Sequence, residues 1–190
     1  MPAKRDHWLV GDQAVVAAER ILDAAGRCFA RSGVTATSIG AIAREAGCSR
    51  PTIYRYFDDR DALRQAFVHR EARRLGVDIA AAVRSVRSPR QRLVTAVLTA
   101  VHGVRANPTL AAWFTDDNAG VASDVAQSSA VIEAMAASFV EGADRETARW
   151  LVRVVLSLLT MPGADELAER RLLERFVAPM VLPSTARSRS

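Results

Sequence analysis

The chain has 190 residues, of which 49% are hydrophobic and 25% charged, and this composition is that of a folded globular protein rather than a disordered one. The formal net charge is +5, but residues 1–64 carry 10 basic and 8 acidic side chains, and the remainder carries 16 and 13. Net charge alone therefore does not indicate nucleic-acid binding, and only the placement of particular arginines can do so.

Membrane, metal and disulfide proteins are not expected. No apolar run reaches the roughly 18 residues that span a bilayer, and the N-terminus has no apolar signal core, so a cytoplasmic protein is predicted. Cys28 and Cys48 lie far apart in the sequence and have no histidine at metal-ligand spacing. We expect two small apolar side chains, no metal and no cofactor. Cys48 precedes a predicted helix, which leaves a redox-sensing thiol as an alternative.

Strand patterns are nearly absent, and helical periodicity predicts an all-α fold of about nine helices. After a flexible arm at residues 1–12, a first helix over 13–32 places Ile21, Ala25, Cys28 and Phe29 on one face. Gly33 suits the left-handed position that ends this helix. Short helices follow at about 38–46 and 49–57, and a long one opens at Asp58-Asp59 and runs to about Val86.

Five more helices complete the chain, separated by proline, glycine and asparagine breaks. Their predicted bounds are 89–106, 108–115, 121–142, 144–161 and 165–180. The expected domains are a DNA-binding head at 13–60 and a helical ligand-binding and dimerisation domain at 61–182. A disordered tail is expected at 183–190.

The segment SIGAIAREAGCSRPTIYRYF, residues 38–57, has the pattern of a helix-turn-helix. Ser38 and Ser49 are the expected caps of its two helices, and Gly47 allows the sharp turn. Ile53 and Phe57 form the buried side of the second helix. Its outer side carries residues that contact phosphates and base edges, which are Arg50, Pro51, Thr52, Arg55 and Tyr56.

Residues 13–64 resemble the DNA-binding domain of the TetR family of repressors. They share the opening S/T-hydrophobic-x-x-I-A-x-x-A-G, the recognition helix T-x-Y-x-x-F and a basic residue, Arg60, three positions after the phenylalanine. The resemblance implies base contacts, phosphate contacts and a cap that presents amides to a phosphate. The implied DNA-binding residues are Ser38, Arg44, Ser49, Arg50, Pro51, Thr52, Tyr54, Arg55, Tyr56 and Arg60.

Two positions depart from the family pattern. Gly40 and Ala41 stand where many relatives have a polar or charged contact residue. We therefore expect the second helix of the motif to make most of the base contacts, through Arg50, Thr52 and Arg55. Lys4 and Arg5 are interpreted as a solvated terminus rather than a minor-groove arm.

From about residue 65 the chain resembles the family only in helical layout and length. The resemblance implies a ligand-binding domain, and the candidates as a set predict a mainly apolar cavity in which His102 supplies one hydrogen bond. Each candidate alone fits an ordinary core position better than a ligand contact. The candidates are His102, Trp113, Phe114, Met135, Phe139 and Trp150. The turn Asp116-Asp117-Asn118 is expected to be a surface loop and not a metal site.

Two helices near the C-terminus are rich in apolar residues, and the first of them predicts either a buried central helix or a subunit interface. The resemblance implies a homodimer, because relatives pair these helices as a four-helix bundle. The expected interface residues are Leu151, Val155, Leu158, Leu172 and Phe176. A two-fold dimer places two recognition helices about 34–36 Å apart, which predicts a palindromic operator in double-stranded DNA.

The sequence thus predicts a ligand-responsive repressor, released from DNA by a small apolar effector. An enzyme is not expected, because we find no nucleophile–base constellation, phosphate-binding glycine loop or metal spacing. The alternatives are the redox sensor and a helical interaction protein that does not bind DNA.

Overall fold

The computed structural model describes residues 6–115, 117–140 and 142–182, and over this part of the chain the fold is all-α, without strands. Its helices are α1 (Asp6–Ser32), α2 (Ile39–Ala46), α3 (Arg50–Tyr54), α4 (Arg60–Val83), α5 (Pro89–Ala106), α6 (Pro108–Ala111), the 3-10 turn η1 (Ala112–Phe114), α7 (Ala119–Ser128), α8 (Ala130–Ala137), α9 (Arg145–Thr160), α10 (Glu166–Leu172), the π-helical turn η2 (Leu173–Val177) and α11 (Ala178–Val181). No helix in these ranges is both long and apolar enough to cross a membrane.

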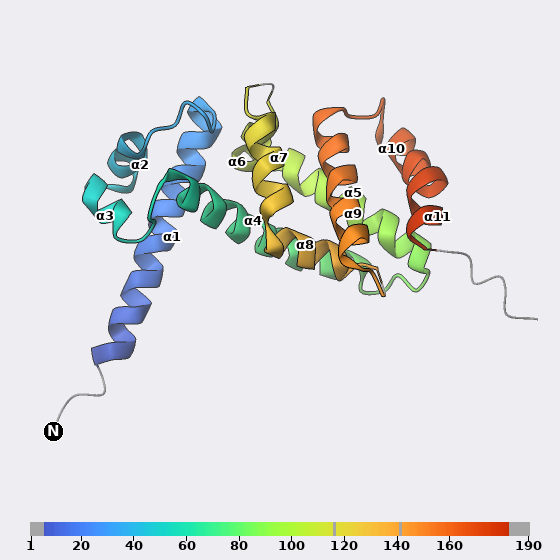
Figure 1. Cartoon of the computed structure of the whole chain (residues 1–190), viewed down its shortest axis with the longest axis horizontal. Helices are drawn as coiled ribbons and strands as arrows, with labels where there is room; N and C mark the ends of the chain where they lie inside the picture. Colours follow the sequence, from blue (N-terminus) through green and yellow to red (C-terminus); the bar gives the residue numbers. More distant parts are fainter. Residues whose placement is uncertain (1–5, 116, 141, 183–190) are drawn as a thin grey trace, which may run out of the picture.

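The helices are arranged along one long axis (Figure 1). Helices α1, α2 and α3 form a head at one end, and α4 leads from the head towards the other helices. Helices α10 and α11 lie at the opposite end. The head is therefore free of contact with the C-terminal helices, and α4 is the covalent path from the head into the rest of the protein.

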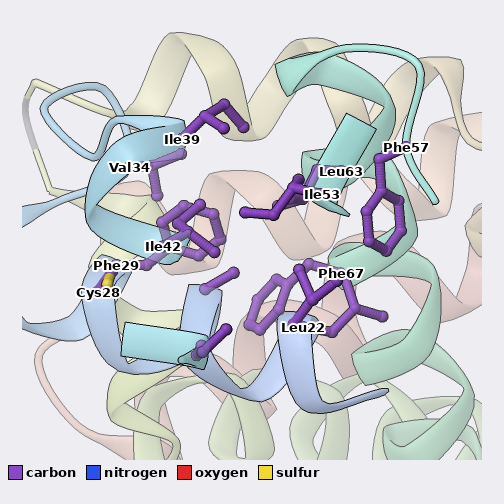
Figure 2. Packing of buried hydrophobic residues seen from close by; sticks show 14 of the residues in the cluster. Leu22, Cys28, Phe29, Val34, Ile39, Ile42, Ile53, Phe57, Leu63 and Phe67 are labelled. Carbon is purple, nitrogen blue, oxygen red and sulfur yellow. The ribbon is translucent and has the colours of Figure 1, made fainter. Parts of the chain in front are cut away.

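The core of the head is built from the faces that the sequence predicts (Figure 2). Ile21, Ala25, Cys28 and Phe29 of α1 are all buried, as are the inward residues of α2. The cluster continues past residue 60 through Leu63 and Phe67 of α4 and then through Trp113 and Ala122. The head is thus not closed by its own three helices, because α4, η1 and α7 complete its core.

The first helix begins earlier than expected, at Asp6, so residues 6–12 are helical rather than part of a flexible arm. Gly11 lies within this helix, where a glycine costs only about 1 kcal/mol. Residues 1–5, with Lys4 and Arg5, and the predicted tail at 183–190 lie outside the described part of the chain.

The single helix predicted at 121–142 is two helices. Ser129 lies between α7 and α8 with extended backbone (φ −84°, ψ 109°), and its hydroxyl accepts a hydrogen bond from Ile132 N at 3.2 Å. Ser128 Oγ donates back to Asp124 O at 2.8 Å, within α7. Serine competes for backbone partners in this way, so it favours helix ends over helix interiors.

The helix predicted at 165–180 contains a π-helical turn over Leu173–Val177. Pro179 follows this turn, has no N–H to donate, and its ring would clash with the carbonyl four residues earlier. Widening the preceding turn accommodates the proline without ending the helix.

A buried carboxylate anchors the C-terminal helices. Glu169 on α10 is 2% exposed and accepts two hydrogen bonds from Arg105 of α5, at 2.8 and 3.0 Å. Gly163 N donates to the same carboxylate at 2.9 Å, and Arg105 also donates to Leu158 O at 2.7 Å. The hydrogen bonds from Arg105 outweigh burial and lower the pKa of Glu169. This pair therefore ties α10 to α5 and to the end of α9.

Replacing this carboxylate tests its contribution to stability. Glu169→Gln should lower the free energy of unfolding at pH 7 by about 1–3 kcal/mol, because charge-assisted hydrogen bonds are lost. The pKa of Glu169 is lowered in the folded state. Ionised Glu169 therefore contributes its full stabilisation of the wild-type protein above pH 4.5, and this stabilisation is lost as the pH falls through the folded-state pKa. The difference between the two proteins should therefore shrink below pH 4.5 in urea unfolding.

Glu166→Gln is the matched control, because Glu166 lies on the same helix and is 55% exposed. Its effect should stay below about 1 kcal/mol at either pH. A Glu169→Gln protein as stable as wild type at pH 7 would contradict the assignment.

Candidate DNA-reading head and ligand cavity

The two helices of the motif are capped as predicted. Ser38 Oγ accepts from Ala41 N at 3.2 Å, and Ser49 Oγ accepts from Thr52 N at 3.2 Å. Gly47 between them has φ +67°, the left-handed conformation that glycine adopts without strain. These local signals fix the angle between α2 and α3.

The short α3 is anchored on one side only. Ile53 is fully buried and Phe57 is 8% exposed. Arg50, Pro51 and Arg55 are exposed, and Tyr54 is 50% exposed. The outer face of α3 therefore offers guanidinium and phenol groups to a partner.

Arg55 and Tyr56 act as a pair on this face. Arg55 Nη2 donates to Tyr56 Oη at 3.3 Å, and its guanidinium carbon lies 5.2 Å from the centre of the tyrosine ring. Thr52 and Tyr56 are half-buried, whereas Ser38, Arg44 and Ser49 are exposed. The predicted DNA-binding residues on α2 and α3 are thus accessible in whole or in part, and their contacts with DNA remain predictions.

Gly40 has a role that the sequence pattern did not reveal. A Cβ added at Gly40 would lie 2.5 Å from Arg50 Nη2 and 2.8 Å from Arg50 Nε. The missing side chain on α2 therefore leaves room for the guanidinium of Arg50. In the sequence, Gly40 stands where many relatives have a contact residue. In the structure, its missing side chain provides the space that the guanidinium of Arg50 occupies.

Arg60, expected to contact the DNA backbone, is engaged within the protein. Its Nη2 donates to the carbonyls of Val34 (3.1 Å) and Thr35, in the loop between α1 and α2. Arg64 donates to Val34 O as well, at 3.1 Å. Burial, and then the neighbouring Arg64, lower the pKa of Arg60. In this conformation Arg60 braces the loop, and a phosphate contact stays a prediction.

The same loop is held from the other side by Asn118, which sequence reasoning placed in a surface turn. Asn118 is 3% exposed, and its Oδ1 accepts from Thr35 N and Thr35 Oγ1, both at 2.9 Å. Its Nδ2 donates to Thr115 Oγ1 at 2.6 Å. The exposed Asp117 fits the prediction, and Asp116 lies outside the described residues. Only the contact across 83 residues reveals the role of Asn118.

A cavity of about 130 Å³ lies between α4, α5, α7, α8 and α9. Four of the ligand candidates line it, namely Trp113, Phe114, Met135 and Phe139, and their contact with a ligand stays a prediction. The other lining residues are also apolar, and they are Val68, Ala72, Leu75, Ile79, Leu93, Ala96, Val97, Ala100, Val104, Leu110, Ala122, Ala126, Ile132, Ala136, Leu151, Val152, Val155, Leu156 and Leu159.

Two ligand candidates do not line this cavity. The His102 side chain is 46% exposed, and its Nε2 lies 3.9 Å from a carboxylate oxygen of Glu166. It sits on the outer side of α5, whose inner side supplies Val97 and Ala100 to the cavity. Trp150 packs instead against the cluster formed by α5, α9 and the C-terminal helices. Residue type on an apolar helix predicts a cavity position for both residues, but tertiary packing places other faces of α5 and α9 at the cavity.

Trp113 belongs to the cavity wall and to the core of the head. Its ring stacks on Phe67, with centroids 6.0 Å apart, and meets Phe29 edge-on at 5.4 Å. Its Nε1 is buried without a hydrogen-bond partner in the described part of the chain. A molecule in the cavity would therefore touch a ring that also supports α1.

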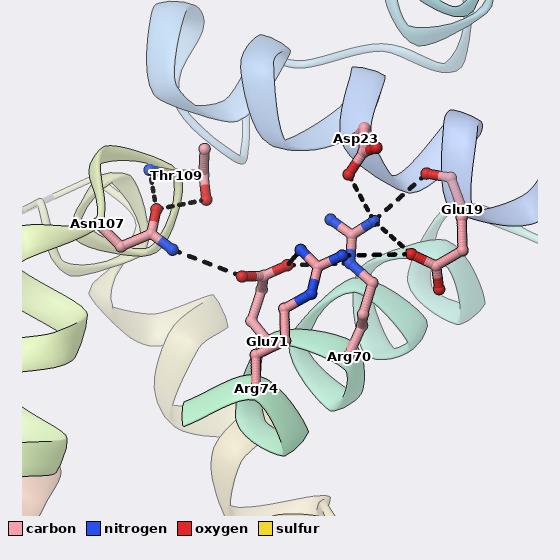
Figure 3. Close-up of polar contacts among 7 residues, drawn as sticks. All are labelled: Glu19, Asp23, Arg70, Glu71, Arg74, Asn107 and Thr109. Carbon is pink, nitrogen blue, oxygen red and sulfur yellow. Dashed lines mark hydrogen bonds and ion pairs between the residues drawn. The ribbon is translucent and has the colours of Figure 1, made fainter. Parts of the chain in front are cut away.

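A polar network forms the second link between the head and the other helices (Figure 3). The guanidinium of Arg70 on α4 is buried and donates to Glu19 and Asp23 of α1, at 3.1 and 2.8 Å. It also bonds the buried Glu71 at 2.9 Å. The network comprises Glu19, Asp23, Arg70, Glu71, Arg74, Asn107 and Thr109. It joins α1, α4 and the start of α6.

The expected dimer residues fall into two groups. Leu151 and Val155 line the cavity and Leu158 is buried, so these three α9 residues face the interior of their own chain. Leu172 and Phe176 are 43% and 57% exposed. Other large apolar side chains at this end of the molecule are also exposed, namely Met161, Leu167 and Met180. Among the expected interface residues, those on α10 and η2 are therefore exposed and those on α9 are not.

Cys28 and Cys48 are both free thiols. Cys28 is buried, which raises the pKa of its thiol, and Cys48 is half-buried. Within residues 6–115, 117–140 and 142–182, no group of three histidine, cysteine or acidic side chains could hold a metal ion.

The helix-turn-helix head on a larger helical body defines the class of protein as a helix-turn-helix transcriptional regulator. The family model described as "Bacterial regulatory proteins, tetR family" matches residues 21–67. The uncharacterized HTH-type transcriptional regulator Rv1255c of Mycobacterium tuberculosis (strain ATCC 25618 / H37Rv) is 46% identical, over 96% of this chain and 94% of its own. The chain belongs to the TetR family of transcriptional regulators, which are not enzymes.

Solved structures share the fold at low sequence identity. RolR in complex with resorcinol is 17% identical with a TM-score of 0.65, over 90% of both chains. A TetR transcriptional regulator from Rhodococcus sp. RHA1 is 20% identical with a TM-score of 0.64, over 93% of this chain and 100% of its own. At these identities the likeness concerns the fold alone.

The bracing role of Arg60 predicts a stability effect that needs no DNA. Arg60→Ala should lower the free energy of unfolding by about 1–3 kcal/mol, because part-buried carbonyls at Val34 and Thr35 lose a charged donor. Arg44→Ala, at an exposed position on α2, should change it by less than about 0.5 kcal/mol. Urea unfolding of the free protein measures both variants, and equal stabilities would refute the bracing role.

Proposed function

We propose that the protein is a ligand-responsive repressor that binds a palindromic operator as a homodimer. The observation that carries the proposal is the outer face of α3, which presents Arg50, Pro51, Tyr54 and Arg55 while Ile53 and Phe57 hold the helix in place. A helix of this kind fits the major groove with its N-terminal residues nearest the bases.

The cavity supports the ligand-responsive part of the proposal. Its apolar wall includes Trp113, which touches the head core, so an occupant has a physical route to the position of α1 and α4. The similar fold of RolR was solved with a small aromatic molecule, resorcinol. Release from DNA requires that the effector bind the non-reading conformation more tightly than the reading one.

The exposed C-terminal apolar side chains support the homodimer. Leu172, Phe176 and Met180 lie at about one-turn intervals on α10, η2 and α11, where a second copy would cover them. A two-fold pairing there leaves both heads uncovered, so that each can reach one half-site of a palindrome.

Binding to genomic DNA tests the reading face. Selection of bound genomic fragments supplies an operator duplex, and fluorescence anisotropy measures its affinity. Arg50→Ala should weaken operator binding by about 5- to 150-fold and relax the preference at one base pair, because a bidentate arginine–guanine contact is worth about 1–3 kcal/mol. Tyr56→Phe should weaken binding about equally on all sequences. Two variants that bind as wild type does would exclude α3 as the reading helix.

Gly40→Ala tests whether the space above α2 positions Arg50. The added Cβ displaces the guanidinium, so operator affinity should fall in the direction of Arg50→Ala, with the fold retained by circular dichroism. In an Arg50→Ala background the same change should add little, because contacting residues are coupled in a double-mutant cycle. Additive effects of the two substitutions would show that Gly40 acts independently of Arg50.

Phe176→Glu tests the dimer. A charge in the centre of an apolar interface should raise the dimer dissociation constant by about 30-fold or more, measured by sedimentation equilibrium. Operator affinity should fall with it. Val77→Glu, at an apolar α4 residue that is 69% exposed, is the control and should leave the dimer intact. A Phe176→Glu dimer of unchanged affinity would place the interface elsewhere.

A further inference from the structure

A second, polar cavity adjoins the apolar one. It encloses about 240 Å³ and is lined by Ala126, Gln127, Glu133, Arg149, Val152 and Arg153. Ala126 of α7 and Val152 of α9 also line the apolar cavity. Ala126 and Val152 therefore form the boundary between the two spaces, with hydrocarbon on one side and charge on the other.

The polar cavity has an excess of positive charge. Glu133 Oε1 accepts from Arg145 at 2.6 Å, and Glu133 Oε2 accepts from Arg149 at 2.9 Å. These bonds, that from Arg149 first, lower the pKa of Glu133, so the carboxylate is ionised and already paired. Arg153 lies one turn further along α9 and forms no ion pair with a described residue. Its guanidinium is thus available to an external anion.

The apolar cavity, in contrast, offers a ligand almost nothing polar. Trp113 carries the one side-chain nitrogen among the described lining residues, and that atom is buried. A cavity of about 130 Å³ is close in size to an engineered apolar cavity of about 150 Å³ that binds benzene. It suits a hydrocarbon body of about six to eight heavy atoms, and any polar group of the ligand must lie at the border.

We propose that the effector is an amphipathic carboxylate whose hydrocarbon body fills the apolar cavity and whose anionic group pairs with Arg153 in the adjoining polar one. The ligand passes between Ala126 and Val152. This inference rests on the proposed function, since it names the class of effector that the same site binds. Arg153 provides a charge-assisted, two-pronged contact that a neutral ligand cannot use.

Octanoate and 1-octanol are the test probes, because they have the same chain and differ in charge. Isothermal titration calorimetry on the full-length protein without DNA, at pH 7, measures both. Wild type should bind octanoate about tenfold more tightly than 1-octanol. Arg153→Gln should abolish this preference and leave the affinity for 1-octanol unchanged. Arg84→Gln, at an exposed arginine that ends α4, is the control and should retain the preference.

The outcomes separate this inference from the proposed function when operator release is measured in parallel. If 1-octanol binds and releases the operator but octanoate does not bind, the ligand-responsive repressor stands and the anionic effector is wrong. If octanoate binds through Arg153 without changing operator affinity, the site stands and the regulatory function fails. Binding of neither probe, or an Arg153→Gln effect equal on both probes, would overturn the inference.

Discussion

The contact of Trp113 with Phe29 and Phe67 is the constraint on which the arrangement of the two parts depends. Phe29 belongs to the head, Phe67 to α4 and Trp113 to the wall of the ligand cavity, with ring centroids 5.2 to 6.0 Å apart. Protein interiors are close-packed and transmit displacement rather than absorb it. The head is therefore not an independent domain joined by a flexible linker, because the helices that hold the cavity supply part of its core.

The buried guanidinium of Arg70 adds a polar constraint on α4. It bonds Glu19 and Asp23 of α1 on one side and Glu71 on the other, so movement of α4 relative to α1 must break or exchange charged hydrogen bonds. Breaking these bonds without replacement is unfavourable, because the guanidinium of Arg70 is buried and would lose its charged partners on α1. On the proposed mechanism, α4 therefore has discrete positions relative to the head, which is what a switch between reading and non-reading states requires.

The features predicted correctly from the sequence are those with local causes. Ser38, Gly47 and Ser49 act through backbone partners within a few residues, so the helix-turn-helix follows from their order alone. Features that depend on contacts between residues far apart in the sequence could not be predicted from the sequence pattern. An apolar helix such as α9 has several faces that look alike in sequence, and only its neighbours decide that Leu151 meets the cavity while Trp150 packs elsewhere. Asn118 and Gly40 likewise gain their roles from partners that are distant in sequence or on another helix.

The one-sided anchoring of α3 has a consequence for how regulators of this type diversify. Ile53 and Phe57 hold the helix, and the positions that face outward contribute little to folding, where exposed substitutions change stability by about 0.5 kcal/mol or less. Mutations at Arg50, Pro51 or Arg55 can therefore accumulate after gene duplication without unfolding the protein. On the proposed function, new operator sequences become accessible one base pair at a time, while the helical scaffold and its cavity stay the same.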